Sequence, residues 1–461
     1  MNKHLIGAPV TAALVLLVAK QLMPFAAAYT LALIVWVAWW WISEVLPLAI
    51  TALLPMVLLP LGGVLPMRSA SAALGNDIII LFMGAFMLAK AVEASQVHKR
   101  IALNLIQRIG ASDGKRVVFA FMLATAFISM WISNTAAVLA LLPVALAISD
   151  ASENKNFQRA LLLGLAYAAS VGGIGTLIGT PPNLIFASVY EQSTGASFGF
   201  SRWLSIGIPL VVIAIPLMAW WLSRRVQLTQ PLVLPELGDM SHYERRVLWV
   251  FGAVVAAWVL RTAPFGGWSA WLQLPEVSDA TVALAGVVAM FMIPSRPQVA
   301  DAPAPPRLLT WTLAGNIPWS ILLLFAGGIA LAQGVTASGL STVLGQALAG
   351  LAVLPLWLLV FCLTLSVSLL TEVTSNTATA TLLMPILAAL SEALQLPPEV
   401  LMIPAVIACS CAFCLPVATP PNSIVFSSER VTVREMVREG MALNVMLAVI
   451  TTGLVMLLIV E

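Results

Sequence analysis

The chain contains two copies of a short polar sequence, each placed inside a strongly apolar segment. Ser133-Asn134-Thr135 returns 242 residues later as Ser375-Asn376-Thr377. A second phrase, Thr180-Pro181-Pro182-Asn183, follows the first copy and returns 239 residues later as Thr419-Pro420-Pro421-Asn422. Paired polar and proline-interrupted segments in corresponding positions of two halves are typical of transporters built from two repeats, whose binding site lies where the interrupted segments meet.

The repeat extends upstream of the two triplets. Residues 81–95 (LFMGAFMLAKAVEAS) align without gaps on residues 324–338 (LFAGGIALAQGVTAS), with 8 of 15 positions identical. The offsets between the copies are 243, 242 and 239 residues. We therefore expect a diverged tandem repeat of about half the chain.

Composition places the chain in a membrane. It has 461 residues, of which 61% are hydrophobic and only 9% charged, and its mean hydropathy is +1.00. A soluble domain would carry roughly 25% charged residues. We expect an all-α polytopic membrane protein with about eleven spanning helices of ~20 residues each, and no nucleic-acid partner. The expected spans are 5–23, 27–43, 45–64, 75–94, 159–189, 203–223, 246–261, 279–294, 316–335, 398–428 and 439–460.

Two further apolar stretches, 115–149 and 353–392, contain the triplets near their middles. A straight helix of either length would extend far beyond a hydrocarbon core of ~30 Å at ~1.5 Å per residue. We predict a re-entrant helical hairpin in each, with the triplet at its tip. Non-helical backbone at that depth is tolerated where it is buried in protein or lines a cavity.

Lys and Arg positions indicate the orientation, because cytoplasmic loops are enriched in these residues. With a cytoplasmic N-terminus and two re-entrant hairpins, 18 Lys and Arg residues fall inside, and Lys20, Arg68, Arg202 and Arg261 fall outside. This arrangement predicts repeats of inverted topology and an extracytoplasmic C-terminus.

The triplets suit the binding of ions without fixed charge. Ser, Asn and Thr donate hydrogen bonds to anionic oxygens and offer their own oxygens to a hard cation. A hairpin tip also places the N-terminus of a half-helix, with its partial positive charge, beside the site. The paired prolines interrupt the helix, so the carbonyls of Gly179 and Ala418 just before them can bind Na⁺. The alternative, small packing residues and ordinary proline kinks, explains one such segment better than two in register.

At these residues the sequence resembles the divalent anion:sodium symporter family, whose members carry C4-dicarboxylates, citrate and sulfate. The resemblance implies scaffold and transport domains, an elevator-type movement, a homodimer and a bacterial inner membrane location. Scaffold helices would occupy 1–112 and 226–351. The hairpin, broken helix and following helix of each repeat would form the transport domain at 113–225 and 352–461.

The resemblance also implies the ligands. Ser129, Ser133, Asn134 and the Gly179 carbonyl would form one sodium site, and Thr371, Thr374, Asn376 and the Ala418 carbonyl the other. Residue 374 is Thr where the family has a small residue such as Ala that contributes its carbonyl. The anion would touch Asn134, Thr135, Thr180, Ser375, Asn376, Thr377, Thr419 and Pro420.

Glu372 beside the second triplet is the residue a proton-coupled carrier could use. Its partner in the first repeat is Met130, so a structural or tuning role is favoured. We expect a carrier that couples inward sodium flux to uptake of a succinate-like dianion. Alternatives are an exchanger, a sodium-coupled citrate or sulfate carrier and, from another class, an anion channel. No nucleophile and base occur together, so neither an enzyme nor an organic cofactor is expected.

Overall fold

The computed structural model describes residues 3–110, 113–150, 152, 154–227, 238–262, 265–297, 306–348 and 354–460. In these residues the fold is helical, and the only β-type pairing is an isolated bridge between Pro294 and Arg307. Six helical segments of the described chain are long and apolar enough to cross a membrane: Phe25–Ser43, Met67–Ser95, Lys155–Ile174, Phe200–Ser223, Trp319–Ala337 and Val433–Val460. Shorter apolar helices accompany them.

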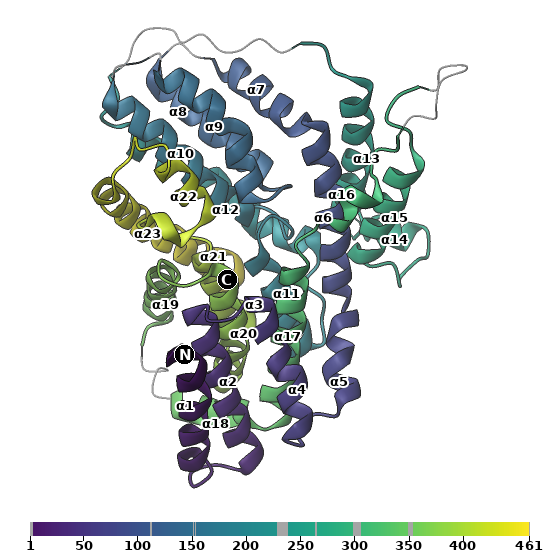
Figure 1. The fold of residues 1–461 in the computed structure, drawn as a ribbon, viewed down its shortest axis with the longest axis vertical. Coiled ribbons are helices and arrows are strands. Elements are labelled where there is room, and N and C mark those ends of the chain that lie inside the picture. The colour runs from purple at the N-terminus through teal and green to yellow at the C-terminus, as the bar shows by residue number, and fades with distance from the viewer. Residues whose placement is uncertain are drawn as a thin grey trace.

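The first half of the chain runs from α1 to α12 (Figure 1). Its elements are α1 (Lys3–Ala19), α2 (Phe25–Ser43), α3 (Leu48–Thr51), α4 (Leu53–Leu61), α5 (Met67–Ala72), η1 (Ala73–Gly75), α6 (Asp77–Ser95), α7 (Val97–Ile109), α8 (Gly114–Ser129), α9 (Asn134–Asp150), α10 (Lys155–Ile174), α11 (Pro181–Thr194) and α12 (Phe200–Ser223).

The second half repeats much of this order. Its elements are α13 (His242–Val259), α14 (Gly267–Trp271), α15 (Asp279–Met292), α16 (Trp311–Gly315), α17 (Trp319–Ala337), α18 (Leu340–Leu348), α19 (Leu356–Thr371), α20 (Asn376–Ala393), α21 (Pro398–Cys409), η3 (Pro416–Ala418), α22 (Pro420–Phe426), α23 (Val433–Val455) and η4 (Met456–Val460).

The two stretches that contain the triplets are helix pairs. In the first, α8 ends at Ser129 and α9 begins at Asn134; in the second, α19 ends at Thr371 and α20 begins at Asn376. Both Asn residues therefore occupy the first turn of a helix, beside backbone N–H groups that have no partner within the helix. Each triplet lies at the point where the chain reverses.

The two proline phrases interrupt helices in the same manner. α10 ends at Ile174 and α11 starts at Pro181, while α21 ends at Cys409 and α22 starts at Pro420. Proline is well suited to the first helical position, where its missing N–H would have no partner. We call residues 175–180 the first break and residues 410–419 the second break.

The expected span at 45–64 is not a single helix. It divides at Ala52 into α3 and α4. Pro55 lacks the N–H that would bond to the Thr51 carbonyl in a continuous helix, which accounts for the interruption. Gly327 of α17 packs here, and a Cβ added to it would lie 2.1 Å from the Ala52 carbonyl oxygen.

The turn that follows α6 is built like the turn that follows α17. Ser95 Oγ donates to the Val92 carbonyl (3.0 Å), and Gln96 has a positive φ of 59°. In the second half, Ser338 Oγ donates to the Val335 carbonyl (3.2 Å), and Gly339 has a φ of 73°. The helices that follow, α7 and α18, lie at opposite ends of the molecule (Figure 1).

Helix α10 forms the buried centre of the helices around the first triplet, where it packs against α8, α9 and α12. All of its residues from Ala160 to Ile174 are buried. Gly172 allows α8 to approach closely, because a Cβ at this position would lie 2.4 Å from the Ala126 carbonyl oxygen. Trp203 of α12 donates its Nε1–H to the Ile174 carbonyl (2.8 Å), which occupies a free acceptor at the end of α10.

Candidate functional site

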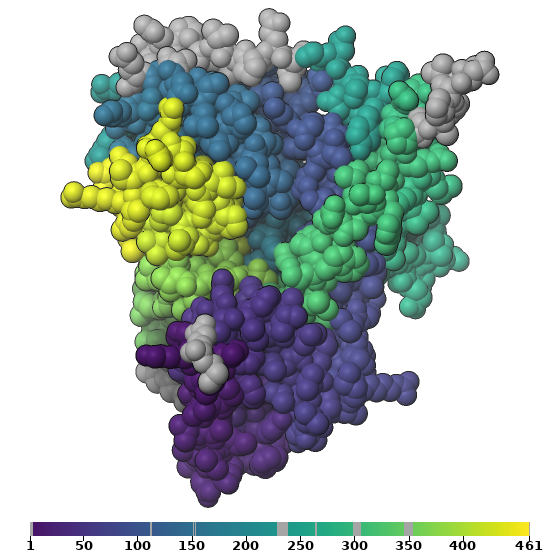
Figure 2. Space-filling model, in the orientation of Figure 1, coloured from purple at the N-terminus to yellow at the C-terminus, as the bar shows by residue number. Residues whose placement is uncertain are grey.

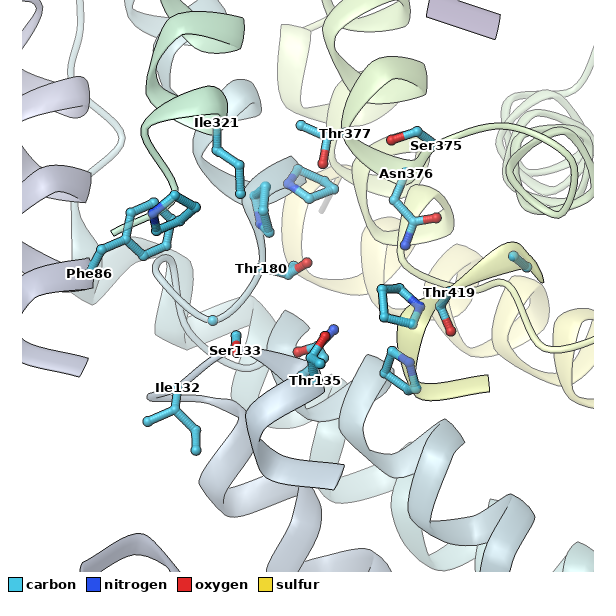
Figure 3. A pocket seen from close by; sticks show the side chains of 18 of the residues that line it. Phe86, Ile132, Ser133, Thr135, Thr180, Ile321, Ser375, Asn376, Thr377 and Thr419 are labelled. Atoms are coloured by element: carbon cyan, nitrogen blue, oxygen red, sulfur yellow. The ribbon is translucent and has the colours of Figure 1, made fainter. Parts of the chain in front are cut away.

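Both hairpin tips and both breaks open onto one cavity of about 890 Å³. The surface is hollowed between the C-terminal segments and the green segments of the second half (Figure 2). Figure 3 shows Ser133 and Thr135 on one side of the cavity and Asn376 and Thr377 on another, with Thr180 and Thr419 between them. All eight residues expected to touch the anion line this cavity: Asn134, Thr135, Thr180, Ser375, Asn376, Thr377, Thr419 and Pro420.

At the first tip, a buried hydroxyl lies behind the triplet. Ser129 Oγ is 2.7 Å from Asn134 Oδ1 and 2.7 Å from the Ala169 carbonyl of α10. Ser129 is fully buried, whereas Ser133 and Asn134 line the cavity. Ser133 Oγ accepts the backbone N–H of Ala136 (3.2 Å). The Asn134 side chain is thus fixed from behind while it faces the cavity.

Two of the expected sodium ligands converge beside Gly173. A Cβ added to Gly173 would lie 2.7 Å from Asn134 Oδ1 and 3.1 Å from the Gly179 carbonyl oxygen. Glycine leaves this space free, so an amide oxygen and an unwound carbonyl share one small volume next to the cavity. Neutral oxygens in this arrangement suit a hard monovalent cation.

The second tip repeats the arrangement of the first. Thr371 Oγ1 donates to Asn376 Oδ1 (2.8 Å) and lies 3.1 Å from the Cys409 carbonyl. Thr371 is fully buried, and the cavity is lined by Asn376, Thr374 and Ala418. The Thr374 hydroxyl donates to Leu370 within the hairpin and lies 2.7 Å from Thr379 Oγ1. Its carbonyl is therefore the better candidate ligand.

Asn183 and Asn422, which end the two proline phrases, hold the breaks in shape. Asn183 Nδ2 donates to the carbonyls of Gly173 (3.1 Å) and Thr176 (2.8 Å). Asn422 Nδ2 donates to the carbonyls of Ala412 and Leu415, both at 3.0 Å. The sequence analysis assigned these residues no role, although their recurrence in the repeated phrase was a usable signal.

Glu372 braces the second tip against the second break. Its carboxylate accepts the backbone N–H groups of Phe413 (2.7 Å), Cys414 (2.9 and 3.0 Å) and Leu415 (3.1 Å), and the Asn444 amide of α23 (2.9 Å). The side chain is buried. Every one of these contacts is an N–H donor, so the geometry suits a carboxylate acceptor and favours the bracing role over a proton-carrying one.

One hydrogen bond connects the two halves at the site. The Tyr167 hydroxyl of α10 donates to the Phe413 carbonyl in the second break (2.7 Å). Both groups are fully buried, and the two rings lie with centroids 5.0 Å apart. The helix that leads into the first break is thereby attached to the second break.

The wall opposite the tips is formed by one face of α6 and not by the matching face of α17. Ala85, Phe86, Ala89, Lys90 and Glu93 line the cavity, whereas their α17 counterparts at 328, 329, 332, 333 and 336 do not. Residues 328 and 329 instead lie against α11 and α20. A Cβ on Gly328 would lie 2.4 Å from Thr381 Cγ2. The site therefore faces this part of α6, whereas the matching part of α17 is packed, and α17 contributes Ile321 near its start to the lining.

No group of three or more His, Cys, Asp or Glu side chains within the described residues could hold a metal ion. The cavity instead offers hydroxyl, amide and carbonyl oxygens. This set fits sodium, which is dehydrated by neutral oxygens, better than a transition metal, which prefers imidazole or thiolate ligands.

Comparisons with known proteins point the same way. A family model described as "Citrate transporter" matches residues 34–399. The sodium-dependent dicarboxylate transporter SdcS of Staphylococcus saprophyticus is 40% identical over 454 residues, covering 94% of this chain and 86% of the relative. SdcS of Staphylococcus aureus strain USA300 is 40% identical over 453 residues, covering 93% and 85%.

Two solved transporter structures share the fold at low sequence identity. The Alcanivorax borkumensis YdaH transporter superposes with a TM-score of 0.57 at 12% identity, covering 84% of this chain and 85% of that one. Neisseria gonorrhoeae MtrF superposes with a TM-score of 0.54 at 14% identity, covering 83% and 80%. These likenesses support a helical membrane-transporter architecture.

Proposed function

The chain belongs to the divalent anion:sodium symporter family, and from that premise we propose that it couples inward sodium flux to uptake of a C4-dicarboxylate such as succinate. It is a transporter and not an enzyme. The observation that carries the proposal is the pair of matching tips, each an Asn amide fixed by a buried hydroxyl, that face one cavity with no fixed cation in either triplet.

Sodium and anion have complementary positions at these tips. One sodium ion would bind Asn134 Oδ1 and the Gly179 carbonyl, with Ser133 and the Ser129 hydroxyl close by. The other would bind Asn376 Oδ1 and the carbonyls of Thr374 and Ala418, with Thr371 behind them. The anion would then bind between the tips, where bound sodium offsets its charge, so that each ligand raises the affinity for the other.

We also propose that the repeats are inverted and that the hairpins are re-entrant. Helices α7 and α18 lie at opposite ends of the molecule and follow turns of the same construction (Figure 1), which supports this topology. Scaffold segments 1–112 and 226–351 would support transport segments 113–225 and 352–461, in a homodimer of the bacterial inner membrane. The N-terminus would be cytoplasmic and the C-terminus extracytoplasmic.

The difference between α6 and α17 supports an elevator-type movement. Residues 328 and 329 of α17 are packed against α11 and α20, whereas the matching residues 85 and 86 of α6 line the cavity. The repeat symmetry therefore predicts a second state in which this part of α6 is covered and this part of α17 is open. Residues 85 and 139 are then the counterparts of Gly328 and Thr381. A disulfide between cysteines at 328 and 381 should trap the present state. One between Ala85→Cys and Leu139→Cys should form only as the carrier cycles with sodium.

Citrate is the second candidate substrate, because the matching family model is described by that name. Hydroxyl and amide donors serve two or three carboxylates alike. Competition of unlabelled succinate, citrate and sulfate against labelled succinate separates the candidates. We expect succinate to compete at the lowest concentration.

Purified protein in liposomes tests the coupling. Uptake of labelled succinate should require an inward sodium gradient and vanish when potassium or choline replaces sodium. An exchanger would instead require succinate inside the vesicle, and a channel would show no saturation. Sodium-independent, saturable uptake into empty vesicles would refute the proposed coupling.

A further inference from the structure

The wall of the cavity that faces the tips carries an ion pair. Lys90 and Glu93 of α6 line the cavity, and Lys90 Nζ lies 2.8 Å from Glu93 Oε2. Their side chains are 30% and 24% exposed, so both are accessible from the cavity and partly enclosed by protein. Lys90 is the only cationic side chain among the described residues that line this cavity.

The other charged side chains that line the cavity are acidic and would repel a dianion. Glu44, Glu93 and Glu372 also line the cavity, and the two triplets contribute only neutral groups. Like charges that share a partly desolvated space repel more strongly than they would in water. An anion moving between the tips and the open side of the cavity therefore has one attractive fixed charge on its path, the Lys90 ammonium.

We infer that Lys90 and Glu93 form a transient carboxylate-binding subsite, an inference that rests on the proposed function. One carboxylate of the substrate takes the place of the Glu93 carboxylate on Lys90, and Glu93 recovers Lys90 when the anion departs. The exchange replaces one carboxylate by another on the same ammonium, so the cation stays paired throughout and the anion is not held permanently.

The subsite belongs to one face of the carrier. The counterparts of Lys90 and Glu93 are Gln333 and Thr336, which carry no charge. Gln333 Oε1 is buried and has no hydrogen-bond partner among the described residues. In a state that opens toward α17, the anion would meet this amide and hydroxyl and no ion pair. The carboxylate-binding subsite is therefore specific to the cavity that α6 lines, on the side that the distribution of Lys and Arg assigns to the cytoplasm.

Membrane vesicles of both orientations test this assignment with the full-length protein and labelled succinate. Lys90→Gln should raise the KM for succinate about fivefold or more in inside-out vesicles, where substrate enters from the cytoplasmic face, and change it less than about twofold in right-side-out vesicles. Glu93→Gln releases Lys90 from its partner and should lower the KM in inside-out vesicles only.

Two variants serve as controls. Lys90→Arg keeps the cation and should restore the wild-type KM on both faces. Gln333→Lys introduces a cation at the matching position of α17 and should lower the KM in right-side-out vesicles only. A structural ion pair would change the amount of folded carrier, and therefore Vmax, equally in both orientations.

The outcomes are distinguishable. An unchanged KM in Lys90→Gln, or an equal change on both faces, overturns the subsite. A change confined to right-side-out vesicles overturns the assignment of this cavity to the cytoplasmic face. If the wild-type vesicles show no sodium-dependent succinate transport, the proposed function fails first, whatever the variants do.

Discussion

The two breaks occupy equivalent positions in the two halves but are supported in different ways. The first contains or adjoins four glycines, at 172, 173, 175 and 179, and the corresponding residues of the second are Cys411, Ala412, Cys414 and Ala418. In the first break a Cβ on Gly179 would lie 2.4 Å from the Gly173 carbonyl oxygen. In the second, Glu372 accepts three consecutive backbone N–H groups.

This difference shows that equivalent breaks in the two halves are stabilised by different contacts. The first break is held by close approach of backbone to backbone, which requires glycine. The second break itself carries larger side chains; a buried carboxylate holds it, and the glycine that permits close backbone approach to it is Gly440 of α23. We therefore expect each half to tolerate changes that the other does not, and the following variants test this comparison.

The largest effect should follow removal of either tip amide. Asn134→Ala and Asn376→Ala each delete the oxygen that the buried hydroxyl orients. Sodium-driven succinate uptake should fall by at least about 100-fold, because loss of a partner that only orients a ligand already costs roughly 10- to 100-fold. Uptake into liposomes measures this, with equal amounts of monodisperse protein as the control. Normal uptake by both variants would remove the proposed sites.

The comparison is sharpest at Gly173 and Ala412. Gly173→Ala places a methyl group 2.7 Å from Asn134 Oδ1, so we expect the sodium concentration for half-maximal uptake to rise about tenfold, the effect of misplacing one ligand. Ala412→Gly is the matched change in the second half and should shift the sodium concentration for half-maximal uptake less than about twofold. Sodium titration of uptake measures both. Equal shifts would contradict the difference between the breaks.

Replacement of the carboxylate should affect the second half in turn. Glu372→Gln exchanges one acceptor oxygen for an N–H₂ group that faces N–H donors. The free energy of unfolding should fall by about 2–3 kcal/mol, the usual contribution of hydrogen bonds to a charged group. Thermal unfolding in detergent measures the loss. Glu392→Gln, at an exposed position on α20, is the control and should leave the unfolding temperature unchanged.

The smallest effect concerns the segments outside the membrane. Burial raises the pKa of Glu244, but the hydrogen bonds from Arg100 and Ser241 lower it by more than burial raises it. The pKa of Glu244 therefore lies below the usual value. The stability this pair provides is present above the unfolded carboxyl value of about 4.3 and is lost as pH falls through the lower folded value. Heat stability should therefore decline below about pH 4.5 in the wild type, and this part of the decline should be absent in Glu244→Gln.

Much of the fold could be predicted from the sequence, because polar and proline residues in apolar membrane segments destabilise a continuous helix unless they line a cavity or a site. The tips and the two breaks follow from the repeated triplet and phrase, and the eight residues expected to touch the anion were implied by the family resemblance. The division at Ala52 was not predicted, because its cause is one proline in a segment whose hydropathy is uniform. The bracing role of Glu372 and the hydrogen bonds from Asn183 and Asn422 to the breaks depend on tertiary contacts that no local sequence pattern encodes.

The sequence also did not predict which of the two equivalent helices, α6 or α17, forms the wall of the cavity. Residues 85 and 328 occupy equivalent positions, and only the structure shows that the first lines the cavity while the second is packed against Thr381. The sequence of the two equivalent faces does not indicate which of them lines the cavity.

The hydrogen bond from Tyr167 to Phe413 has a consequence for how ions load. If one sodium ion binds at each break as proposed, the first ion would order α10, and the Tyr167 hydroxyl of this helix also restrains the second break. The second ion would then bind to a backbone whose freedom is already reduced. Sodium activation should accordingly be sigmoidal, and loss of this phenol in Tyr167→Phe should bring the Hill coefficient closer to one.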